Sequence, residues 1–155
     1  AQLDRFMMKI SMGFPTFAQE LEIMDRYISE SPYAALSTVM TTQELITMQE
    51  WVKGVHIGQE VREYLLHIVE ATRKNAKLKL GVSTRGTLAF MRACQSLAAI
   101  RGRNYVIPED IKYLAPFVLE HRLVLAGGYL RTAEQKAIMD SILSSVEVPT
   151  ENFVS

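Results

Sequence analysis

The sequence Leu80-Gly81-Val82-Ser83-Thr84-Arg85-Gly86 leads into the longest run of helical periodicity in the chain. Ser83 is a favoured N-cap residue, because its hydroxyl can accept a hydrogen bond from a free amide of the first helical turn. Apolar side chains then recur every three or four residues, at Leu88, Met91, Cys94, Leu97 and Ala98. Gly102 is placed to end the run. The stretch therefore predicts a long amphipathic helix between Ser83 and Gly102.

Arg85 is the unusual residue of this stretch. A cation in the first turn opposes the helix dipole and costs about 0.3–1 kcal/mol. Free amides together with a guanidinium at one helix end form a receptor for an anion, above all a phosphate. The alternative is that the Arg85 side chain bends away to a surface carboxylate. The local pattern alone leaves both interpretations open.

Composition limits the classes of protein to which the chain can belong. Its 155 residues, 48% of them hydrophobic, suffice for one domain with a core. Seventeen basic and 17 acidic side chains balance, whereas a nucleic-acid-binding module should carry a basic surplus. The single cysteine excludes an internal disulfide and is typical of a reducing compartment. No apolar run reaches the roughly 18 residues of a membrane span. We therefore expect a soluble, cytoplasmic protein that binds no nucleic acid.

The N-terminal residues follow a different period. Apolar side chains alternate over residues 6–12, which predicts a half-buried β-strand. We find no convincing partner strand, and a lone strand is not independently stable. Residues 1–12 are therefore expected to end the sheet of a preceding α/β domain. The chain does not begin with Met, and we expect it to be a piece of a longer protein.

The remaining chain reads as helical. Capping boxes at Thr16 with Gln19 and at Thr41 with Glu44 predict two helix starts, each followed by apolar side chains at helical spacing. The first of these helices is expected to end at Ser31-Pro32, and Gly127-Gly128 is expected to lie in a loop. A helix is predicted over about 59–75, with Val61, Leu65, Ile68 and Thr72 facing inward. Further helices are predicted from Pro108, where Pro116 should kink the helix, and from Thr132. Residues 76–82 are expected to form a loop. The predicted fold is an all-α bundle of six helices over residues 16–149, preceded by one orphan β-strand and followed by a polar tail at 150–155.

Several kinds of catalytic site are absent from the sequence. No glycine-rich stretch ends in Gly-Lys-Ser/Thr, so the phosphate-binding P-loop is missing and this chain alone should not hydrolyse a nucleotide. The three histidines, His56, His67 and His121, share no ligand-spaced cluster, so we expect no metal site. Cys94 lies on the apolar stripe of its helix and is expected to be a core side chain.

Six stretches, taken in order and spacing, resemble the C-terminal third of MoxR-type AAA+ ATPases. They are Ala1-Gln2-Leu3-Asp4-Arg5-Phe6, Gly13-Phe14-Pro15, Ala71-Thr72-Arg73, Gly81-Val82-Ser83-Thr84-Arg85-Gly86, Arg101-Gly102-Arg103-Asn104-Tyr105-Val106-Ile107-Pro108-Glu109-Asp110 and His121-Arg122. The resemblance covers nearly the whole chain. It implies that residues 1–12 complete the nucleotide-binding domain and that residues 16–149 form the helical lid.

The resemblance also implies roles for individual residues. Arg85 matches the sensor-2 arginine, which reaches the terminal phosphate of ATP in the same subunit, with Ser83 and Thr84 beside it. Arg5 matches the arginine finger that acts on the nucleotide of the neighbouring subunit. Thr84 and Gly86 stand where the family usually has Pro and Ala; the glycine costs the first turn about 0.5–1 kcal/mol. Arg73 matches a family position as well, and we interpret it as a favourable charge at a helix C-terminus.

At the level of the whole protein, the resemblance implies ATP hydrolysis coupled to chaperone-like remodelling or maturation of partner proteins. ATP and Mg²⁺ would be held mainly by the preceding domain. Ring homo-oligomers, typically hexamers, and partners with von Willebrand factor A domains are also implied. The alternative is a freestanding helical adaptor that binds a partner helix without nucleotide. A DNA-binding helix-turn-helix is disfavoured, because no helix offers a basic, polar recognition face.

Overall fold

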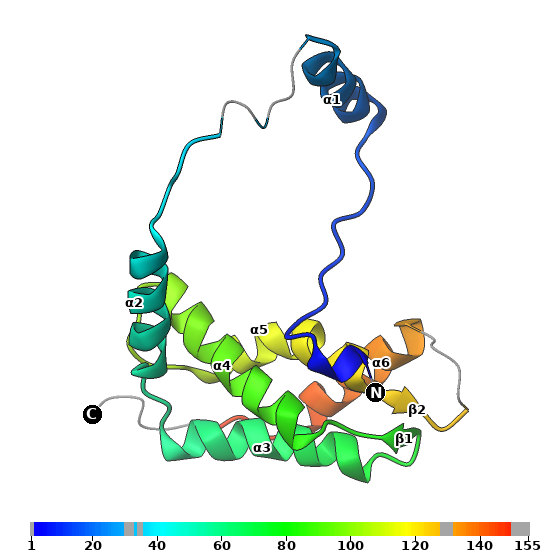
Figure 1. Cartoon of the computed structure of the whole chain (residues 1–155). Helices are drawn as coiled ribbons and strands as arrows, with labels where there is room; N and C mark the ends of the chain where they lie inside the picture. The colour runs from blue at the N-terminus through cyan, green and yellow to red at the C-terminus, as the bar shows by residue number, and fades with distance from the viewer. Residues whose placement is uncertain (1, 30–32, 34–35, 128–131, 150–155) are drawn as a thin grey trace. The chain divides into compact units, whose positions relative to one another are not determined.

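The computed structural model describes residues 2–29, 33, 36–127 and 132–149 and is drawn in Figure 1. Six α-helices dominate the described part, which confirms the predicted helical class. Their bounds are α1 (Phe17–Ser29), α2 (Thr42–Lys53), α3 (Gln59–Lys74), α4 (Thr84–Ile100), α5 (Pro108–Leu119) and α6 (Thr132–Ser145). Short 3₁₀ turns η1 (Leu3–Arg5) and η3 (Glu120–Arg122) and two strands, β1 (Leu78–Leu80) and β2 (Val124–Leu125), complete the named elements. The predicted helix stop at Ser31-Pro32, the loop residue Gly128 and the tail 150–155 lie outside the described residues.

The chain divides into two compact units. Residues 10–49 form one of them, with α1 and most of α2. Both predicted capping boxes are present: the Thr16 amide donates to Gln19 Oε1 at 2.8 Å, and the Thr41 amide donates to Glu44 Oε2 at 2.7 Å. No described side chain of residues 10–49 is buried. The apolar faces predicted for α1 and α2 are therefore exposed. Within the described residues, these helices are supported by their capping boxes and not by burial in a core.

The second unit comprises the N-terminal segment up to Lys9 and the chain from Glu50 onward, and it holds the hydrophobic core. The core side chains come mainly from α3, α4, α5 and α6, with α4 and α5 in extensive contact. On α3 the predicted inward residues Val61, Leu65, Ile68 and Thr72 are all buried. Each fully buried aliphatic side chain contributes about 1.5–3 kcal/mol to stability. On α4, Leu88 was expected inside but is 56% exposed, whereas Gly86 and Phe90 on either side of it are buried, so the buried face of the helix is turned away from Leu88.

One prediction about strands was wrong, and the other, which needs the preceding domain, is not tested by this chain. Residues 78–80, expected in a loop, form β1 and pair antiparallel with β2, placing Leu78 opposite Leu125. The strands are too short to show a two-residue period in the sequence. Conversely, residues 6–12 form no strand in this chain. A strand needs a ladder of partners, and among the described residues the only backbone–backbone hydrogen bond from residues 6–12 to a distant element is the one from the Lys9 amide to Phe117 O, at 2.8 Å.

The connection from α4 to α5 is built around Asp110. This carboxylate is fully buried and pairs with Arg103 at 2.7 Å and with Arg101 at 3.1 Å. It also accepts a hydrogen bond from the Ile107 amide at 3.2 Å, at the start of α5. A buried charge is tolerated when it is paired and hydrogen-bonded. Gly102, with φ +72°, ends α4 as predicted. The stretch 101–110 therefore fixes the geometry between α4 and α5.

Candidate functional site

The loop before α4 is tied to the end of α3. The Arg73 Nε donates to Val82 O at 2.8 Å, and the Val82 amide donates to Thr72 Oγ1 at 3.0 Å. A Cβ at Gly81 would lie 2.6 Å from the Arg73 backbone nitrogen, so this close approach requires glycine. The Arg73 side chain thus holds Val82, a more specific contact than the dipole interaction expected from the sequence. These bonds fix where α4 begins.

Ser83 caps α4 as predicted. Its Oγ accepts a hydrogen bond from the Gly86 amide at 3.1 Å. The same hydroxyl donates to the carboxylate of Asp4, whose oxygens lie 2.9 and 3.1 Å away. The Ser83 proton is therefore already engaged with Asp4. This link joins the start of α4 to the N-terminal 3₁₀ turn η1.

Arg85 lies in the first turn of α4. Its side chain is exposed and makes no hydrogen bond or ion pair with any described residue. Thr84 is exposed too, and the backbone amides of Thr84 and Arg85 have no acceptor within the described part of the chain. The alternative in which Arg85 pairs with a carboxylate is not observed among these residues. One guanidinium and two unpaired amides at one helix end form an arrangement suited to a phosphate.

Arg5 lies at the end of η1 and is also exposed, without an ion pair in the described ranges. Its neighbour Asp4 contacts Ser83, two residues before Arg85. The structure therefore brings the segments of both predicted arginines together, although they lie 80 positions apart in the sequence. In Figure 1 the 3₁₀ turn that carries Arg5 is drawn in dark blue near the N label, on the body formed by α3 to α6.

The residue that holds η1 in place is Arg122, for which the sequence offered no role. Its side chain is 1% exposed. It donates to the Phe6 carbonyl at 2.5 Å and to the Met7 carbonyl at 3.2 Å, and it donates to the Val118 carbonyl within its own helical segment. Its Nε lies 3.3 Å from the Asp4 carboxylate. Burial lowers the pKa of Arg122, and the Asp4 carboxylate opposes that shift.

Gly86 provides the room for Arg122. A Cβ at position 86 would lie 2.7 Å from Val82 Cγ1 and 2.9 Å from Arg122 Cδ, both on buried side chains. Gly86→Ala gains up to about 1 kcal/mol of helix propensity but loses about 1–3 kcal/mol to overpacking. We expect a net loss of about 1 kcal/mol in the free energy of unfolding by urea. Gly127→Ala is the control, because a Cβ there meets nothing within 4 Å among the described residues. A more stable Gly86→Ala variant would contradict the steric argument.

His121, next to Arg122, is expected to make the stability of the helical unit depend on pH. Burial lowers its pKa, the Phe6 carbonyl 3.2 Å from Nε2 raises it, and the Arg122 guanidinium lowers it further. Between the lowered pKa and about 6.5 the unfolded chain binds more protons than the folded chain, so stability should decrease as the pH falls through this window. The pKa of Glu120 is raised by burial and by Asp140, so the contribution of this carboxyl to stability decreases as the pH rises. Because the wild type and the variant both retain Glu120, this contribution cancels when they are compared.

The measurement is urea unfolding of the wild type and of His121→Gln at about pH 7.5 and about pH 5.5. The variant cannot be protonated at this position and should lose part of the pH dependence. His67→Gln, at an exposed position of α3, is the control. Equal pH dependence of the wild type and His121→Gln would show that His121 does not titrate differently in the two states.

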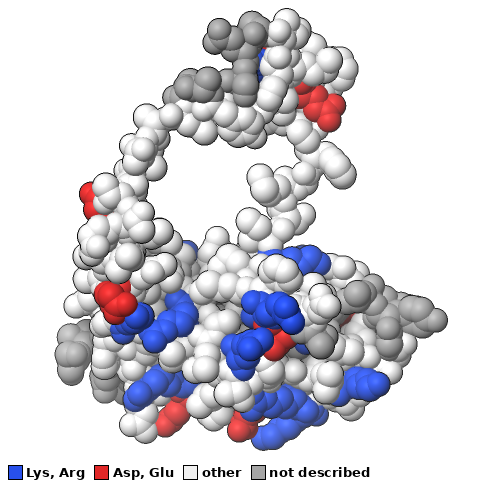
Figure 2. Space-filling view, in the orientation of Figure 1, with Lys and Arg blue, Asp and Glu red and all other residues white. Residues whose placement is uncertain are grey.

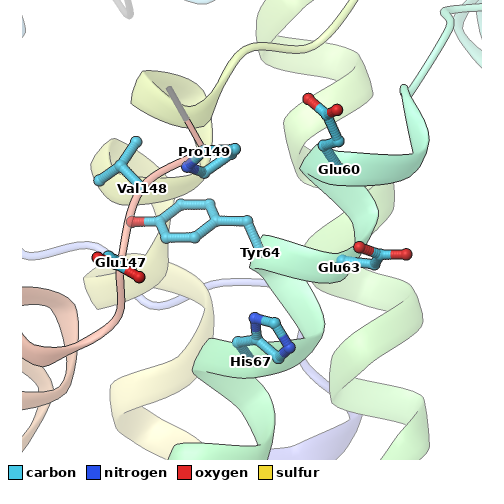
Figure 3. A pocket seen from close by; sticks show the side chains of 7 residues that line it. All are labelled: Glu60, Glu63, Tyr64, His67, Glu147, Val148 and Pro149. Carbon is cyan, nitrogen blue, oxygen red and sulfur yellow. The ribbon is translucent and has the colours of Figure 1, made fainter. Parts of the chain in front are cut away.

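A pocket of about 410 Å³ lies elsewhere on this unit, between α3 and the segment after α6 (Figure 3). Its lining residues are Glu60, Glu63, Tyr64, His67, Glu147, Val148 and Pro149. Three carboxylates at its rim would repel a phosphate. The Tyr64 hydroxyl is buried with no partner in the described ranges, and burial raises its pKa. This pocket is therefore unsuited to a nucleotide.

Other chemistry is disfavoured at the described positions. No group of three or more His, Cys, Asp or Glu side chains that could hold a metal ion occurs among them. Cys94 is fully buried, and burial, together with the charge of Asp110, raises its pKa, so its thiol stays protonated at neutral pH. Figure 2 shows Lys and Arg side chains spread over the visible face of the helical body, with a few acidic side chains between them. The exposed Arg85 guanidinium at the start of α4 is therefore the described feature best suited to bind a ligand, namely an anion.

The comparisons with known proteins concern the family and the fold of the chain. Residues 70–145 match the family model of the AAA lid domain. The chain is 40% identical over 152 residues to the uncharacterized protein YeaC of Bacillus subtilis, covering 97% of this chain and 48% of that protein. It is 34% identical to the chaperone MoxR1 of Mycobacterium tuberculosis, covering 99% of this chain and 43% of that protein. A crystal structure of a candidate ATPase from Cytophaga hutchinsonii superimposes with a TM-score of 0.83 at 29% identity, covering 96% of this chain and 48% of the other.

These similarities define the helical unit as an AAA+ lid domain. The chain belongs to the MoxR-type AAA+ ATPases, as the resemblance predicted. It spans about half the length of the relatives that it matches. No described helix is both long enough and apolar enough to cross a membrane.

Proposed function

We propose that this chain is the lid of an ATPase that hydrolyses ATP and uses the energy for chaperone-like remodelling or maturation of partner proteins. The observation that carries the proposal is Arg85: an exposed guanidinium beside two backbone amides at the start of α4, none of which has a partner among the described residues. The family match of residues 70–145 and the similarity to a protein named as a chaperone support it.

In this proposal Arg85 acts as the sensor-2 residue and binds the terminal phosphate in its own subunit. Its fork of N–H donors would stabilise the negative charge that develops as the phosphoryl group is transferred. Ser83 sets the position of the helix start through its bond to the Gly86 amide, while Thr84 and Arg85 offer backbone donors to the phosphate. Arg5 acts as the arginine finger on the nucleotide of a neighbouring subunit. A subunit would thus present one arginine to each of two nucleotides.

This assignment implies a ring of identical subunits, with a hexamer proposed, working in the cytoplasm. Partners with von Willebrand factor A domains are proposed on the family resemblance alone. Mg²⁺ would accompany ATP. The described residues fit the phosphate but offer no oxygen cluster for the cation, so its ligands would come from the nucleotide and from the α/β domain.

The experiment is ATP turnover by the full-length protein, compared with turnover by the 155-residue chain alone. We expect turnover by the full-length protein and none by this chain, which lacks a P-loop. A full-length protein without ATP turnover under oligomer-forming conditions would overturn the proposal. It would favour the adaptor alternative, in which the helices bind a partner without nucleotide.

A further inference from the structure

We infer that Asp4 and Arg122 are positioning residues that attach the Arg5 segment to the start of α4, so that Arg5 and Arg85 move as one piece. This inference rests on the proposed function for its consequence in ATP hydrolysis. Its structural part, the attachment itself, stands on contacts within this chain. None of the sequence motifs assigns a role to Asp4 or Arg122.

The first half of the attachment is a set of hydrogen bonds from the Arg122 side chain to the backbone of the N-terminal segment. Its guanidinium donates to the carbonyls of Phe6 at 2.5 Å, Met7 at 3.2 Å and Asp4 at 3.3 Å. Three backbone carbonyls, those of Asp4, Phe6 and Met7, thus accept hydrogen bonds from one buried guanidinium. Hydrogen bonds from a charged donor are about twice as strong as neutral ones. Arg122 therefore fixes the course of the chain on both sides of Arg5.

The second half is the Asp4 carboxylate, which lies between two elements of the lid. It pairs with Arg122 Nε at 3.3 Å on one side and accepts from the Ser83 hydroxyl at 2.9 Å on the other. Ser83 in turn holds the first turn of α4 through the Gly86 amide. The absence of a side chain at Gly86 lets Arg122 lie against that turn, since a Cβ there would lie 2.9 Å from Arg122 Cδ. Every link between Arg5 and Arg85 is therefore a direct contact.

The consequence concerns communication between nucleotides. In the proposed ring, Arg85 contacts the nucleotide of its own subunit and Arg5 that of the neighbour. A displacement of the α4 start by one nucleotide would be carried through Ser83, Asp4 and Arg122 to the other arginine. Coupling of this kind requires an element whose position both sites influence. The 3₁₀ turn η1 and the first turn of α4, which are joined by these contacts, form such an element.

The structural test uses amide hydrogen exchange in the 155-residue chain. The Lys9 amide bonds to Phe117 O at 2.8 Å and reports attachment of the N-terminal segment. In Asp4→Ala we expect its exchange to accelerate on the order of 10- to 100-fold, the factor that corresponds to a lost charge-assisted hydrogen bond. Amides in the middle of α3, such as that of Ile68, should keep their rate. Asp25→Ala on the exposed α1 is the matched control. An unchanged Lys9 rate in Asp4→Ala would overturn the attachment.

The functional test uses ATP turnover by the full-length protein. If Asp4 acts through Arg5, then Asp4→Ala lowers kcat, and adding Asp4→Ala to Arg5→Ala lowers kcat no further. Asp4→Glu, which keeps the carboxylate, should recover part of the activity. Additive losses in the double variant would overturn the positioning role. If Arg5→Ala itself leaves turnover unchanged, the proposed role of Arg5 fails, whereas the exchange experiment still decides whether Asp4 attaches the segment.

Discussion

Replacing Arg85 with alanine in the full-length protein is expected to lower ATP turnover at saturating ATP by about 10²–10³-fold, the usual loss when one charge-stabilising donor is removed from a transition state. The same change should leave stability within about 0.5 kcal/mol, because the side chain is exposed and contacts none of the described residues through a hydrogen bond or ion pair. A large effect on turnover without an effect on unfolding would separate a role at the nucleotide from a role in folding.

The controls for Arg85 follow from the structure. Arg85→Lys keeps the charge but loses the forked donors, so we expect an intermediate rate. Arg62→Ala removes another exposed arginine, on α3, and should leave turnover at the wild-type level. The purified variants are compared by steady-state phosphate release and by urea unfolding. Unchanged turnover of Arg85→Ala would remove the sensor-2 assignment and with it the main support for the proposed function.

Replacing Arg5 with alanine is expected to have an even larger effect, about 10³–10⁵-fold on turnover, as for arginine fingers of other NTPases. Because the proposed finger acts on the neighbouring subunit, the diagnostic experiment mixes two kinds of subunit. Arg5→Ala subunits keep an intact nucleotide site, and subunits unable to bind nucleotide keep an intact Arg5. Their mixtures should regain turnover beyond the sum of the separate preparations.

The expected recovery arises only at interfaces where a competent nucleotide faces an intact Arg5. Arg62→Ala subunits mixed with the same partners serve as the control, and their turnover should follow dilution of fully active subunits. If mixtures with Arg5→Ala show no turnover beyond the separate preparations, the arginine does not act across the interface. A role within its own subunit, or no role, would then remain.

The helices were predictable because each carries its own local signal. Ser83, Thr16 and Thr41 sit at helix starts where their side chains accept from backbone amides, and all three bonds are present in the structure. Gly102 ends α4 with the positive φ expected of its residue type. Such signals act over three or four residues, so they can be read directly from the sequence. The predicted inward face of α3 was confirmed for the same reason.

The features that were missed depend on contacts between distant residues. The strands β1 and β2 are three and two residues long, and their pairing joins residues about 45 positions apart. Leu88 fits the helical period of α4 but is 56% exposed, whereas Gly86 and Phe90 on either side of it are buried. Periodicity shows that a helix has an apolar face; it does not show which edge of that face packs against the core.

The candidate site was predicted in part. The N-cap Ser83 and the exposure of Arg85 follow from local rules, and the structure has both. The roles of Arg85 and Arg5 at a nucleotide remain predictions. The contacts of Arg122 with Asp4 and Phe6 span more than 110 positions, and no spacing rule connects residues so far apart. The one available signal was that both stretches, Leu3-Asp4-Arg5-Phe6 and His121-Arg122, belong to the motifs shared with the family.

The burial of Cys94 has a practical consequence for spectroscopy. The sequence contains one cysteine, and its thiol lies in the core in its unreactive, protonated form. Maleimide reagents should therefore leave the native chain unlabelled. Cysteines introduced at the exposed Gln2, next to η1, and at the exposed Leu88 of α4 would become the two attachment points for a fluorophore pair. Energy transfer between the dyes in this chain could then follow the N-terminal turn relative to the helix, with the native thiol left in place.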